Sequence, residues 1–310
     1  MAPERMLPVL INRTGGTAAR MGERLEAEVR EAFHKAGVAI DLQLIRGDEM
    51  TEAVSAVAAA PMVAVGGGDG TLGCAAGVLA GSGTALAILP LGTRNHLAHE
   101  LGIPDDLGEV ARLIAQGPRR TIDLGRVGDR VFVNNASIGL YPALVRRRDE
   151  HPAPKWLAAL PAAVGALGRL RHHRLRLILD GEPQPVVTPL LFVGNNRYTL
   201  DRPAIGTREA LDDGKLSVYA VASRRRLALI GFALRTLAGR ADPGRDFAAI
   251  GDVARLKVEG HGRHIDVALD GEVVRLPLPL AFASDAGALT VIAPDAARLS
   301  GDGASPRPAA

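Results

Sequence analysis

A glycine-rich turn after a short apolar segment constrains the fold of this chain more than any other feature. Residues 62–65 are apolar, as in a buried strand, and the sequence Gly-Gly-Gly-Asp-Gly-Thr follows at positions 66–71. The Ala-, Gly- and Leu-rich residues 72–80 then predict a helix. Glycines let a backbone approach a phosphate closely, and a helix N-terminus adds partial positive charge. The pattern therefore indicates a nucleotide-phosphate site at a strand–helix junction.

Other interpretations of this turn compete with a general nucleotide site. A Walker A loop requires a lysine after its last glycine, and the turn has none. Gly68, Gly70 and Gly73 match the dinucleotide pattern G-x-G-x-x-G, but the expected strand at 85–89 runs into Pro90–Asn95 without the carboxylate that would hold a ribose. A turn that serves only strand–helix packing stays open, although a second polar loop follows one βα unit later.

Asp69 is the carboxylate within the turn. It is not expected to bind a phosphate directly, because like charges repel. We expect it to hold a divalent cation, or water around one. The alternative is a carboxylate that caps the helix at 72–80.

Four motifs in this order resemble the diacylglycerol kinase catalytic-domain family. They are Gly-Gly-Gly-Asp-Gly-Thr at 66–71, Leu-Pro-Leu-Gly-Thr-Arg-Asn at 89–95, Leu-Asp-Asp-Gly-Lys-Leu at 211–216 and Ala-Leu-Asp-Gly-Glu at 268–272. An opening strand that ends in Asn12, with Gly15, Gly16 and Thr17 behind it, also agrees. The family includes the soluble bacterial lipid kinases and is related to sphingosine and ceramide kinases. The resemblance covers residues 6–295.

The resemblance implies which residues contact the nucleotide. In the family, the matching positions bind ATP, which implies contacts from Gly66, Gly67, Gly68, Asp69, Gly70, Thr71 and Thr93. Asn12 and Asn95 are further candidates, although Asn95 could equally cap the helix that follows it. The implied cofactors are ATP and Mg²⁺.

The resemblance also implies two magnesium sites. Asp69 would serve the catalytic ion, and Asp123 would join the same network. A further family carboxylate, in Gly-Thr-x-Asn-Asp, is replaced by His96, and magnesium prefers oxygen ligands. A second, structural ion would be bound by the side chain of Asp213 and the backbone carbonyls of Ala210 and Lys215. A plain turn explains that last motif equally well from the residues alone.

Asp270 is the expected general base. The resemblance assigns it to the lipid hydroxyl, with Glu272 assisting. The residues Val-Ala-Leu before it predict a strand that delivers the carboxylate into a tight Asp-Gly turn. An ordinary hairpin turn is the alternative, since Asp-Gly is one of the commonest hairpin signals.

The order of elements predicts an α/β domain followed by an all-β domain. Residues 1–120 alternate strands and helices, including one helix at 18–36, which indicates a three-layer domain with a parallel sheet, similar to that of NAD kinases. Residues 121–285 contain short strands, among them 130–137 and 184–193, which predicts an antiparallel sandwich. The segment 286–299, with a strand at 288–292, is expected to return to the first domain, and 300–310 to be a disordered tail.

Composition excludes several classes of function. Aromatic residues make up only 3% of the chain, which argues against nucleic-acid stacking, and the single cysteine, Cys74, excludes an internal disulfide. The chain contains no run of 18 apolar residues, so we expect it not to span a bilayer. Basic residues cluster at 146–148, 169–174 and 224–226, and the apolar segment 156–167 lies between two of these clusters, which is compatible with peripheral contact with an anionic membrane. Ordinary solvated faces explain each basic cluster equally well, and a helix that covers the sandwich stays open as the alternative for 156–167.

We therefore predict a cytoplasmic, peripherally membrane-associated kinase that transfers the γ-phosphate of ATP to a membrane lipid. Diacylglycerol is the first expectation and a sphingoid base the second. The active site is expected in a cleft between the two domains. A nucleotide- or lipid-binding regulator that has lost catalysis and an NAD kinase stay open as alternatives. No nucleic-acid partner is expected, and a homodimer is an open expectation.

Overall fold

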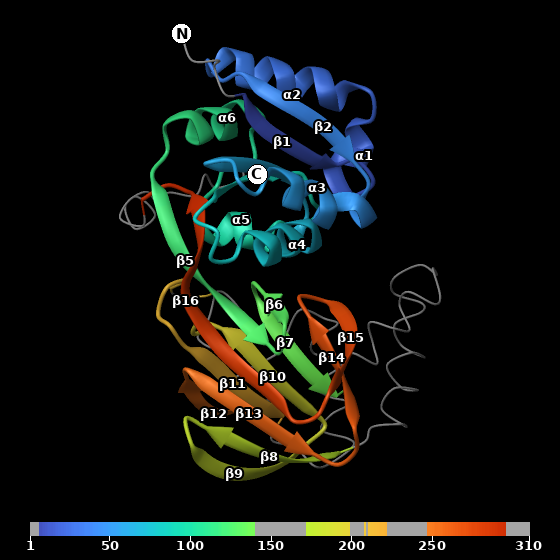
Figure 1. Cartoon of the computed structure of the whole chain (residues 1–310), viewed down its shortest axis with the longest axis vertical. Helices are drawn as coiled ribbons and strands as arrows, with labels where there is room; N and C mark the ends of the chain where they lie inside the picture. Colours follow the sequence, from blue (N-terminus) through green and yellow to red (C-terminus); the bar gives the residue numbers. More distant parts are fainter. Residues whose placement is uncertain (1–5, 140–171, 199–207, 209, 222–246, 296–310) are drawn as a thin grey trace, which may run out of the picture. The chain divides into compact units, whose positions relative to one another are not determined.

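The computed structural model describes residues 6–139, 172–198, 208, 210–221 and 247–295 (Figure 1). The chain divides into two compact units. Unit 1 comprises Met1–Ile122 and Gly287–Ala310, and unit 2 comprises Asp123–Ala286. Several predicted features lie outside the described residues, namely the apolar segment 156–167, the basic clusters at 146–148 and 224–226, most of the cluster at 169–174 and the tail at 300–310.

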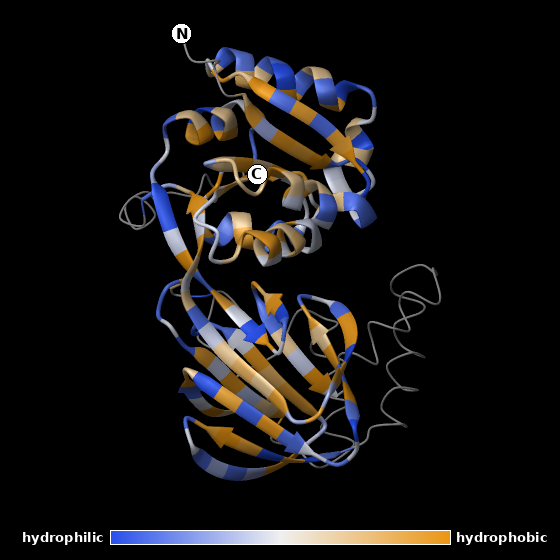
Figure 2. Ribbon diagram, in the orientation of Figure 1, coloured by the Kyte–Doolittle hydropathy of each residue, from blue (hydrophilic) through white to orange (hydrophobic). Residues whose placement is uncertain are grey.

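Unit 1 is built on a parallel sheet, as the alternating pattern predicted. Its strands follow the order β2-β1-β3-β4-β16. They are β1 (Leu7–Asn12), β2 (Ile40–Ile45), β3 (Met62–Gly67), β4 (Ala85–Pro90) and the end of β16 (Leu280–Ile292). The edge strand β2 alternates hydrophobic and hydrophilic residues, as Figure 2 shows, whereas β4 is buried along its whole length. Full burial is typical of a central strand that helices cover on both faces.

The helices of unit 1 lie on both faces of this sheet, so the three-layer prediction is confirmed. Helices α2 and α6 pack together on one face, and α3 and α4 pack together on the other (Figure 1). The elements are α1 (Gly16–Met21), α2 (Arg24–Lys35), the 3₁₀ turn η1 (Gly47–Glu49), α3 (Met50–Val57), α4 (Asp69–Leu79), α5 (His96–Glu100) and α6 (Leu107–Gln116). The single helix predicted at 18–36 is wrong. Gly22 interrupts it with φ +57°, a left-handed conformation that ends α1 before α2 begins.

Unit 2 is the predicted antiparallel sandwich. One sheet has the order β12-β11-β10-β7-β14-β15, and the other contains β16-β13-β8-β9 together with β5 and β6. Its strands are β5 (Arg119–Val127), β6 (Arg130–Phe132), β7 (Asn135–Gly139), β8 (His173–Leu179), β9 (Glu182–Thr188), β10 (Leu190–Asn195), β11 (Leu216–Val221), β12 (Phe247–Val253), β13 (Arg255–Gly260), β14 (His264–Leu269), β15 (Glu272–Pro277) and β16. Side chains of both sheets form one core, in which Leu191 and Val193 of the first sheet join Leu177 and Val258 of the second.

Two strands predicted in unit 2 are each divided in the structure. The expected strand at 184–193 breaks at Pro189, which has no backbone N–H to donate to the ladder. The expected strand at 130–137 breaks after Phe132, because the N–H groups of Val133 and Asn134 bond to the carboxylate of Asp270 instead of to a neighbouring strand.

The last strand is much longer than the sequence predicted. Only 288–292 was expected, whereas β16 begins at Leu280. Its first residues pair antiparallel with β13, and Thr290 and Val291 pair parallel with β4. The small and polar residues from Ala283 to Gly287 have low strand propensity. Pairing with neighbouring strands, rather than local propensity, therefore accounts for the length of β16. Among the described helices, none is long and apolar enough to cross a membrane.

Candidate active site

Three loops of unit 1 meet at the carboxyl ends of parallel strands. They follow β1, β3 and β4 and span residues 12–17, 66–71 and 91–95. Thr17 joins the first loop to the third, because its N–H donates to Leu91 O at 2.8 Å and its hydroxyl donates to Gly92 O at 3.2 Å. Asn12 joins the first loop to the second, because its Nδ2 donates to the Thr71 hydroxyl at 3.0 Å. The predicted nucleotide-binding segments therefore form one connected surface.

Glycines permit these loops to pack backbone against backbone. A Cβ added to Gly92 would lie 2.3 Å from the Cα of Gly68, and one added to Gly16 would lie 2.7 Å from Leu91 O. A Cβ at Gly67 would lie 2.6 Å from Thr71 Cβ. Gly70 differs from these positions, since no described atom lies within 4 Å of a Cβ built there. Packing therefore requires glycine at positions 16, 67 and 92, whereas Gly70 leaves the backbone open to a ligand.

Asp69 begins helix α4 and joins it to helix α5, which follows the third loop. Its Oδ1 accepts a hydrogen bond from the backbone N–H of Leu97 at 3.3 Å. The first N–H groups of a helix have no acceptor inside the helix, so this end of α4 offers donors and partial positive charge beside the carboxylate. Phosphate oxygens and a cation bound to the carboxylate suit this arrangement.

Asp69 and Thr71 fit a magnesium ion that takes most of its ligands from substrate phosphates and water. Asp69 supplies a carboxylate oxygen and Thr71 a hydroxyl, both hard donors. Within the described part of the chain, no three His, Cys, Asp or Glu side chains cluster closely enough to hold a metal. Magnesium in kinases is commonly held by one or two carboxylates, substrate phosphates and water, so such a cluster is not needed.

Asn95 holds the third loop in shape. It is buried and has φ +51°, and its Oδ1 accepts from Gly92 N at 2.9 Å while its Nδ2 donates to Pro90 O at 3.0 Å. Its side chain makes no capping bond to α5, so the capping alternative is wrong. Nucleotide contact by Asn95 stays a prediction. Thr93 and Arg94 are exposed on this loop, and His96 is exposed at the start of α5.

Asp270 of unit 2 lies in the turn between β14 and β15, with φ +47°. Its Oδ2 accepts from Val133 N at 2.6 Å, and its Oδ1 accepts from the N–H groups of Asn134 at 2.8 Å and Asn135 at 3.0 Å. These three hydrogen bonds fasten the turn to the connection between β6 and β7. An ordinary hairpin turn does not require such bonds. Glu272 begins β15 and is exposed.

Burial raises the pKa of Asp270 above its ordinary value. The three backbone N–H groups and the positive charge of Arg208 oppose this shift but do not outweigh it. A carboxylate with a raised pKa is a stronger base than an exposed aspartate, which suits removal of a hydroxyl proton near neutral pH.

Arg208 is a residue that the sequence interpretation missed. Its guanidinium is buried and donates to Val133 O at 2.7 Å and to Asn134 Oδ1 at 3.0 Å. The hydroxyl of Tyr198 donates to Asn134 O at 3.0 Å. Arg208 thus supports the same β6–β7 connection that holds Asp270. No motif or periodicity marks this position in the sequence.

Asp123 and Asp213 lie together in unit 2, on either side of Asn196. The Asn196 amide nitrogen donates to Asp123 Oδ2 at 2.7 Å and to Asp213 Oδ1 at 3.0 Å. The buried Asn196 Oδ1 has no hydrogen-bond partner among the described residues. Two carboxylates and an unsatisfied amide oxygen are donors that fit Mg²⁺. A role for Asp123 in the network of Asp69 stays a prediction.

The two backbone ligands predicted for this site differ in their surroundings. The carbonyl of Lys215 accepts from Asn196 N at 2.8 Å, so one of its lone pairs is already used. Ala210 lies half-buried one residue before Leu211, whose carbonyl accepts from Asp123 N at 2.7 Å. The motif at 211–216 therefore wraps around Asp123 rather than forming an isolated turn.

The sequence and the fold both match known lipid kinases. Residues 6–127 match the model of the diacylglycerol kinase catalytic domain. A diacylglycerol kinase of Mycobacterium tuberculosis is 31% identical over 82% of this chain and 85% of its own length. A probable YegS-like lipid kinase of Pseudomonas aeruginosa is 31% identical over 95% of this chain and 96% of its own length.

A solved structure supports the fold over almost the whole chain. It is a putative diacylglycerol kinase from Bacillus anthracis, with a TM-score of 0.69 and 21% identity, and the match covers 94% of this chain and 96% of that one. This likeness concerns the fold, while the sequence matches concern ancestry. Together with the order of the loops around Asp69, they show that the chain belongs to the diacylglycerol kinase family of lipid kinases.

Proposed function

We propose that this chain transfers the γ-phosphate of Mg-ATP to a hydroxyl of a membrane lipid, with diacylglycerol as the first candidate. The observation that carries the proposal is the meeting of three loops around Asp69 at the start of α4. A relative named diacylglycerol kinase, 31% identical over most of its length, supports the choice of lipid.

The nucleotide is proposed to bind at the Gly66–Thr71 loop. The open backbone at Gly70 and the first N–H groups of α4 would donate to phosphate oxygens. When bound at Asp69, magnesium would neutralise charge on the phosphates during transfer. Asn12 would keep the Thr71 hydroxyl in place through its 3.0 Å hydrogen bond.

Asp270 is proposed as the base that accepts the proton of the lipid hydroxyl. A carboxylate has about four acceptor positions, and three backbone N–H groups occupy three of them here. The remaining position is proposed to accept the hydroxyl. Since phosphoryl transfer passes through a loose transition state, the proton is expected to move late, when a carboxylate is basic enough.

The membrane side of the proposal follows from composition. We infer a cytoplasmic protein that touches an anionic membrane surface, because its basic residues cluster and its substrate would be a lipid. Nucleic acid is not proposed as a partner. A homodimer stays a prediction.

The test is transfer of radiolabel from ATP to lipids in mixed micelles, with diacylglycerol, a sphingoid base and NAD as separate acceptors. Wild type should label diacylglycerol, and Asp270→Asn should lose nearly all of that activity. Asp180→Asn is a matched control, because Asp180 also begins an Asp-Gly turn with φ +46° and accepts two backbone N–H groups. That variant should keep full activity.

Three other results of this assay would contradict parts of the proposal. Equal labelling by wild type and Asp270→Asn would sink the base assignment. Labelling of NAD without lipid would replace the lipid kinase with an NAD kinase. Binding of ATP without transfer to any acceptor would favour a regulator that has lost catalysis.

A further inference from the structure

The three loops that meet around Asp69 contain no lysine. Residues 12–17, 66–71 and 91–95 carry one carboxylate, that of Asp69, and two arginines, Arg13 and Arg94. A nucleotide triphosphate carries several negative charges, and a magnesium ion neutralises only part of them. A Walker A loop obtains further positive charge from its lysine. In this chain that charge has to come from another residue.

Helix α1 is fixed against the third loop by its backbone. The N–H groups of Thr17 and Ala18 both donate to Leu91 O, at 2.8 Å and 3.3 Å, and Ala18 is buried. A Cβ added to Gly16 would lie 2.8 Å from the Cα of Gly92, so the start of α1 packs directly on the backbone of that loop. The helix is therefore in place before a nucleotide binds.

Arg20, in the last turn of α1, is hydrogen-bonded to this junction. Its Nη2 donates to the Thr17 hydroxyl at 2.7 Å, and that hydroxyl donates to Gly92 O at 3.2 Å. Gly92 in turn packs on Gly68, the residue before α4, since a Cβ added to Gly92 would lie 2.3 Å from Gly68 Cα. A short chain of contacts thus connects the guanidinium of Arg20 to the start of α4.

The positive charge of Arg20 is not neutralised by a neighbouring carboxylate. Among the described residues its guanidinium forms no ion pair, whereas Arg30 on the next helix is held by Glu26 at 2.8 Å. The bond from Arg20 goes to an uncharged hydroxyl, that of Thr17. A guanidinium has five N–H donors in a planar fork, and this one is exposed, so donors remain for an anion.

Arg13 and Arg94 are weaker candidates for the same role. Both are exposed on the first and third loops. Within the described part of the chain, no hydrogen bond or ion pair fixes either guanidinium. A side chain that is already held in place loses less conformational freedom when a ligand binds, which favours Arg20.

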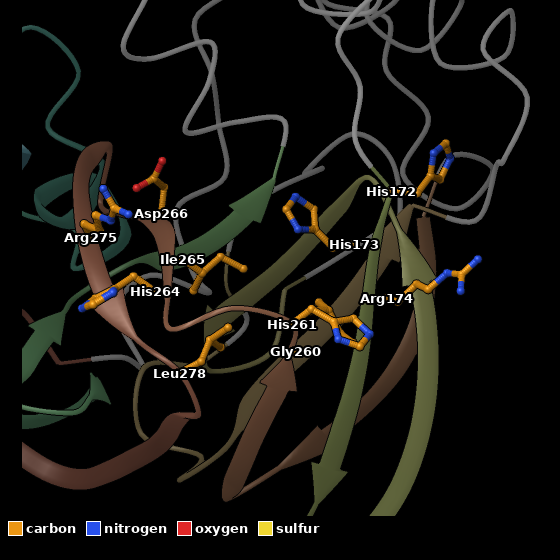
Figure 3. A pocket seen from close by; sticks show the side chains of 11 residues that line it. His172, His173, Arg174, Gly260, His261, His264, Ile265, Asp266, Arg275 and Leu278 are labelled. Atoms are coloured by element: carbon orange, nitrogen blue, oxygen red, sulfur yellow. The ribbon is translucent and has the colours of Figure 1, made fainter.

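Basic side chains that merely lie near one another do not form an anion site. A hollow in unit 2 is lined by Arg174, Asp266 and Arg275, among others (Figure 3). Arg174 lies on the outer face of one sheet, and Asp266 and Arg275 lie on the outer face of the other, because the residues that alternate with them belong to the core. These charges do not converge. In unit 1, by contrast, hydrogen bonds tie the guanidinium to the loops.

We propose that Arg20 binds the phosphate chain of the nucleotide and that Thr17 positions it. The inference rests on the nucleotide site proposed above at Gly66–Thr71. A guanidinium donates in pairs to phosphate oxygens. Together with the first N–H groups of α4, Arg20 would supply the positive charge that a lysine supplies in a Walker A loop.

The experiment measures binding of Mg-ATP and of inorganic triphosphate with magnesium to the full chain by calorimetry, without lipid. Arg20→Gln should weaken the binding of both ligands roughly 10- to 100-fold, the range for loss of a charge-assisted contact. Arg20→Lys keeps the charge but not the fork, so its loss should be smaller. Weaker binding of ATP with unchanged binding of triphosphate would assign the guanidinium to the nucleoside and overturn the proposal.

Variants of Thr17 test the positioning role. Thr17→Val keeps the shape of the side chain but loses the bonds to Arg20 and to Gly92 O, and it should weaken ATP binding roughly tenfold. Thr17→Ser keeps the hydroxyl and should bind ATP as wild type does. In the Arg20→Gln background, Thr17→Val should cause little further loss. Additive losses would show that Thr17 does not act through Arg20.

Arg24→Gln is the matched control. It removes an exposed guanidinium four residues later, which makes only a 4.0 Å ion pair with Glu28. This variant should bind both ligands as wild type does, and thermal unfolding should be nearly unchanged in it and in Arg20→Gln. Equal affinities of wild type and Arg20→Gln, or an equal loss in Arg24→Gln, would overturn the proposal.

The transfer assay separates this inference from the lipid kinase proposal. Weaker ATP binding by Arg20→Gln, in a protein whose wild type labels no lipid, would support Arg20 and refute only the transfer to lipid. Labelling of lipid by wild type, with normal ATP binding by Arg20→Gln, would refute only the role of Arg20.

Discussion

The carboxylate of Asp69 accepts a hydrogen bond from the backbone N–H of Leu97, 28 residues later, at 3.3 Å. This bond joins the start of α4 to the first turn of α5. The same side chain is the proposed magnesium ligand, so two roles meet in one carboxylate. They can be separated, because an amide oxygen can accept the Leu97 bond but carries no negative charge.

Asp69→Asn is therefore expected to fold normally and to lose catalysis. The loss of a charged magnesium ligand should lower kcat/KM at least about 100-fold, which corresponds to several kcal/mol of charge stabilisation. Initial rates with ATP and diacylglycerol, together with thermal unfolding, check both parts. Asp106→Asn is the matched control, since Asp106 also begins a helix and accepts from Glu109 N at 2.9 Å. An Asp69→Asn protein with normal rates would remove Asp69 from the site.

Three glycines should respond differently to the same added methyl group. Gly92→Ala places a Cβ 2.3 Å from Gly68 Cα, so the backbone must move, and we expect a cost of about 1–3 kcal/mol and weaker ATP binding. Gly70→Ala meets no described atom, so it should fold well but obstruct the phosphates. Chemical denaturation and nucleotide titration distinguish the two effects.

Gly77→Ala is the control for this series. Gly77 is an exposed residue within α4, away from its ends. No described atom outside its own turns is close to an added Cβ. Alanine there should stabilise the protein by about 0.5–1 kcal/mol and leave ATP binding unchanged. If Gly70→Ala behaved like Gly77→Ala in both measurements, the phosphates would not approach at Gly70.

Arg208→Gln should move the acidic limb of the pH–rate profile to higher pH. The positive charge of Arg208 lowers the pKa of Asp270, against the larger effect of burial. Without that charge the pKa of Asp270 rises further, so a higher pH is needed to ionise the base. The profile of kcat/KM against pH measures this limb.

Arg208→Lys provides the comparison for this prediction. Lysine keeps the charge but cannot reproduce both the 2.7 Å bond to Val133 O and the 3.0 Å bond to Asn134 Oδ1. The acidic limb should stay close to that of wild type, while stability falls by about 1–3 kcal/mol. An identical shift of the limb in both variants would show that geometry, rather than charge, sets the pKa of Asp270.

Magnesium should stabilise unit 2 through Asp123 and Asp213. Binding to the folded state alone would add about 2.7 kcal/mol at an ion concentration about 100 times Kd. A rise in Tm on adding magnesium without nucleotide measures this. Asp213→Asn should abolish the rise, and Asp212→Asn, an exposed neighbour, should retain it. A full rise in Asp213→Asn would place the ion elsewhere.

The sequence predicted the parts of this protein that depend on local pattern. Hydrophobic periodicity predicts the alternation of strands and helices in unit 1 and the antiparallel sheets of unit 2. The glycines, which lack side chains, predict the close approach of the loops. The loops around Asp69 could be expected to meet, because parallel strands end at one edge of a sheet.

The missed features depend on contacts between distant residues. The break after Phe132 exists because Asp270, more than 130 residues later, binds Val133 and Asn134. Arg208 acts on the same connection from a segment without periodicity. The length of β16 comes from pairing with β13, which outweighs the poor strand propensity of its small residues. No local rule contains this information.

Strands β5 and β16 each contribute residues to both units, and within unit 1 a Cβ built at Gly287 would lie 3.9 Å from Thr121 Cβ. The whole sandwich is thus an insertion whose entry and exit points are neighbours. An insertion of this kind can be exchanged or reshaped over evolutionary time while the host sheet keeps its register. Sequence changes within the sandwich can therefore accumulate without disturbing the strand pairing of the parallel sheet that carries the loops around Asp69.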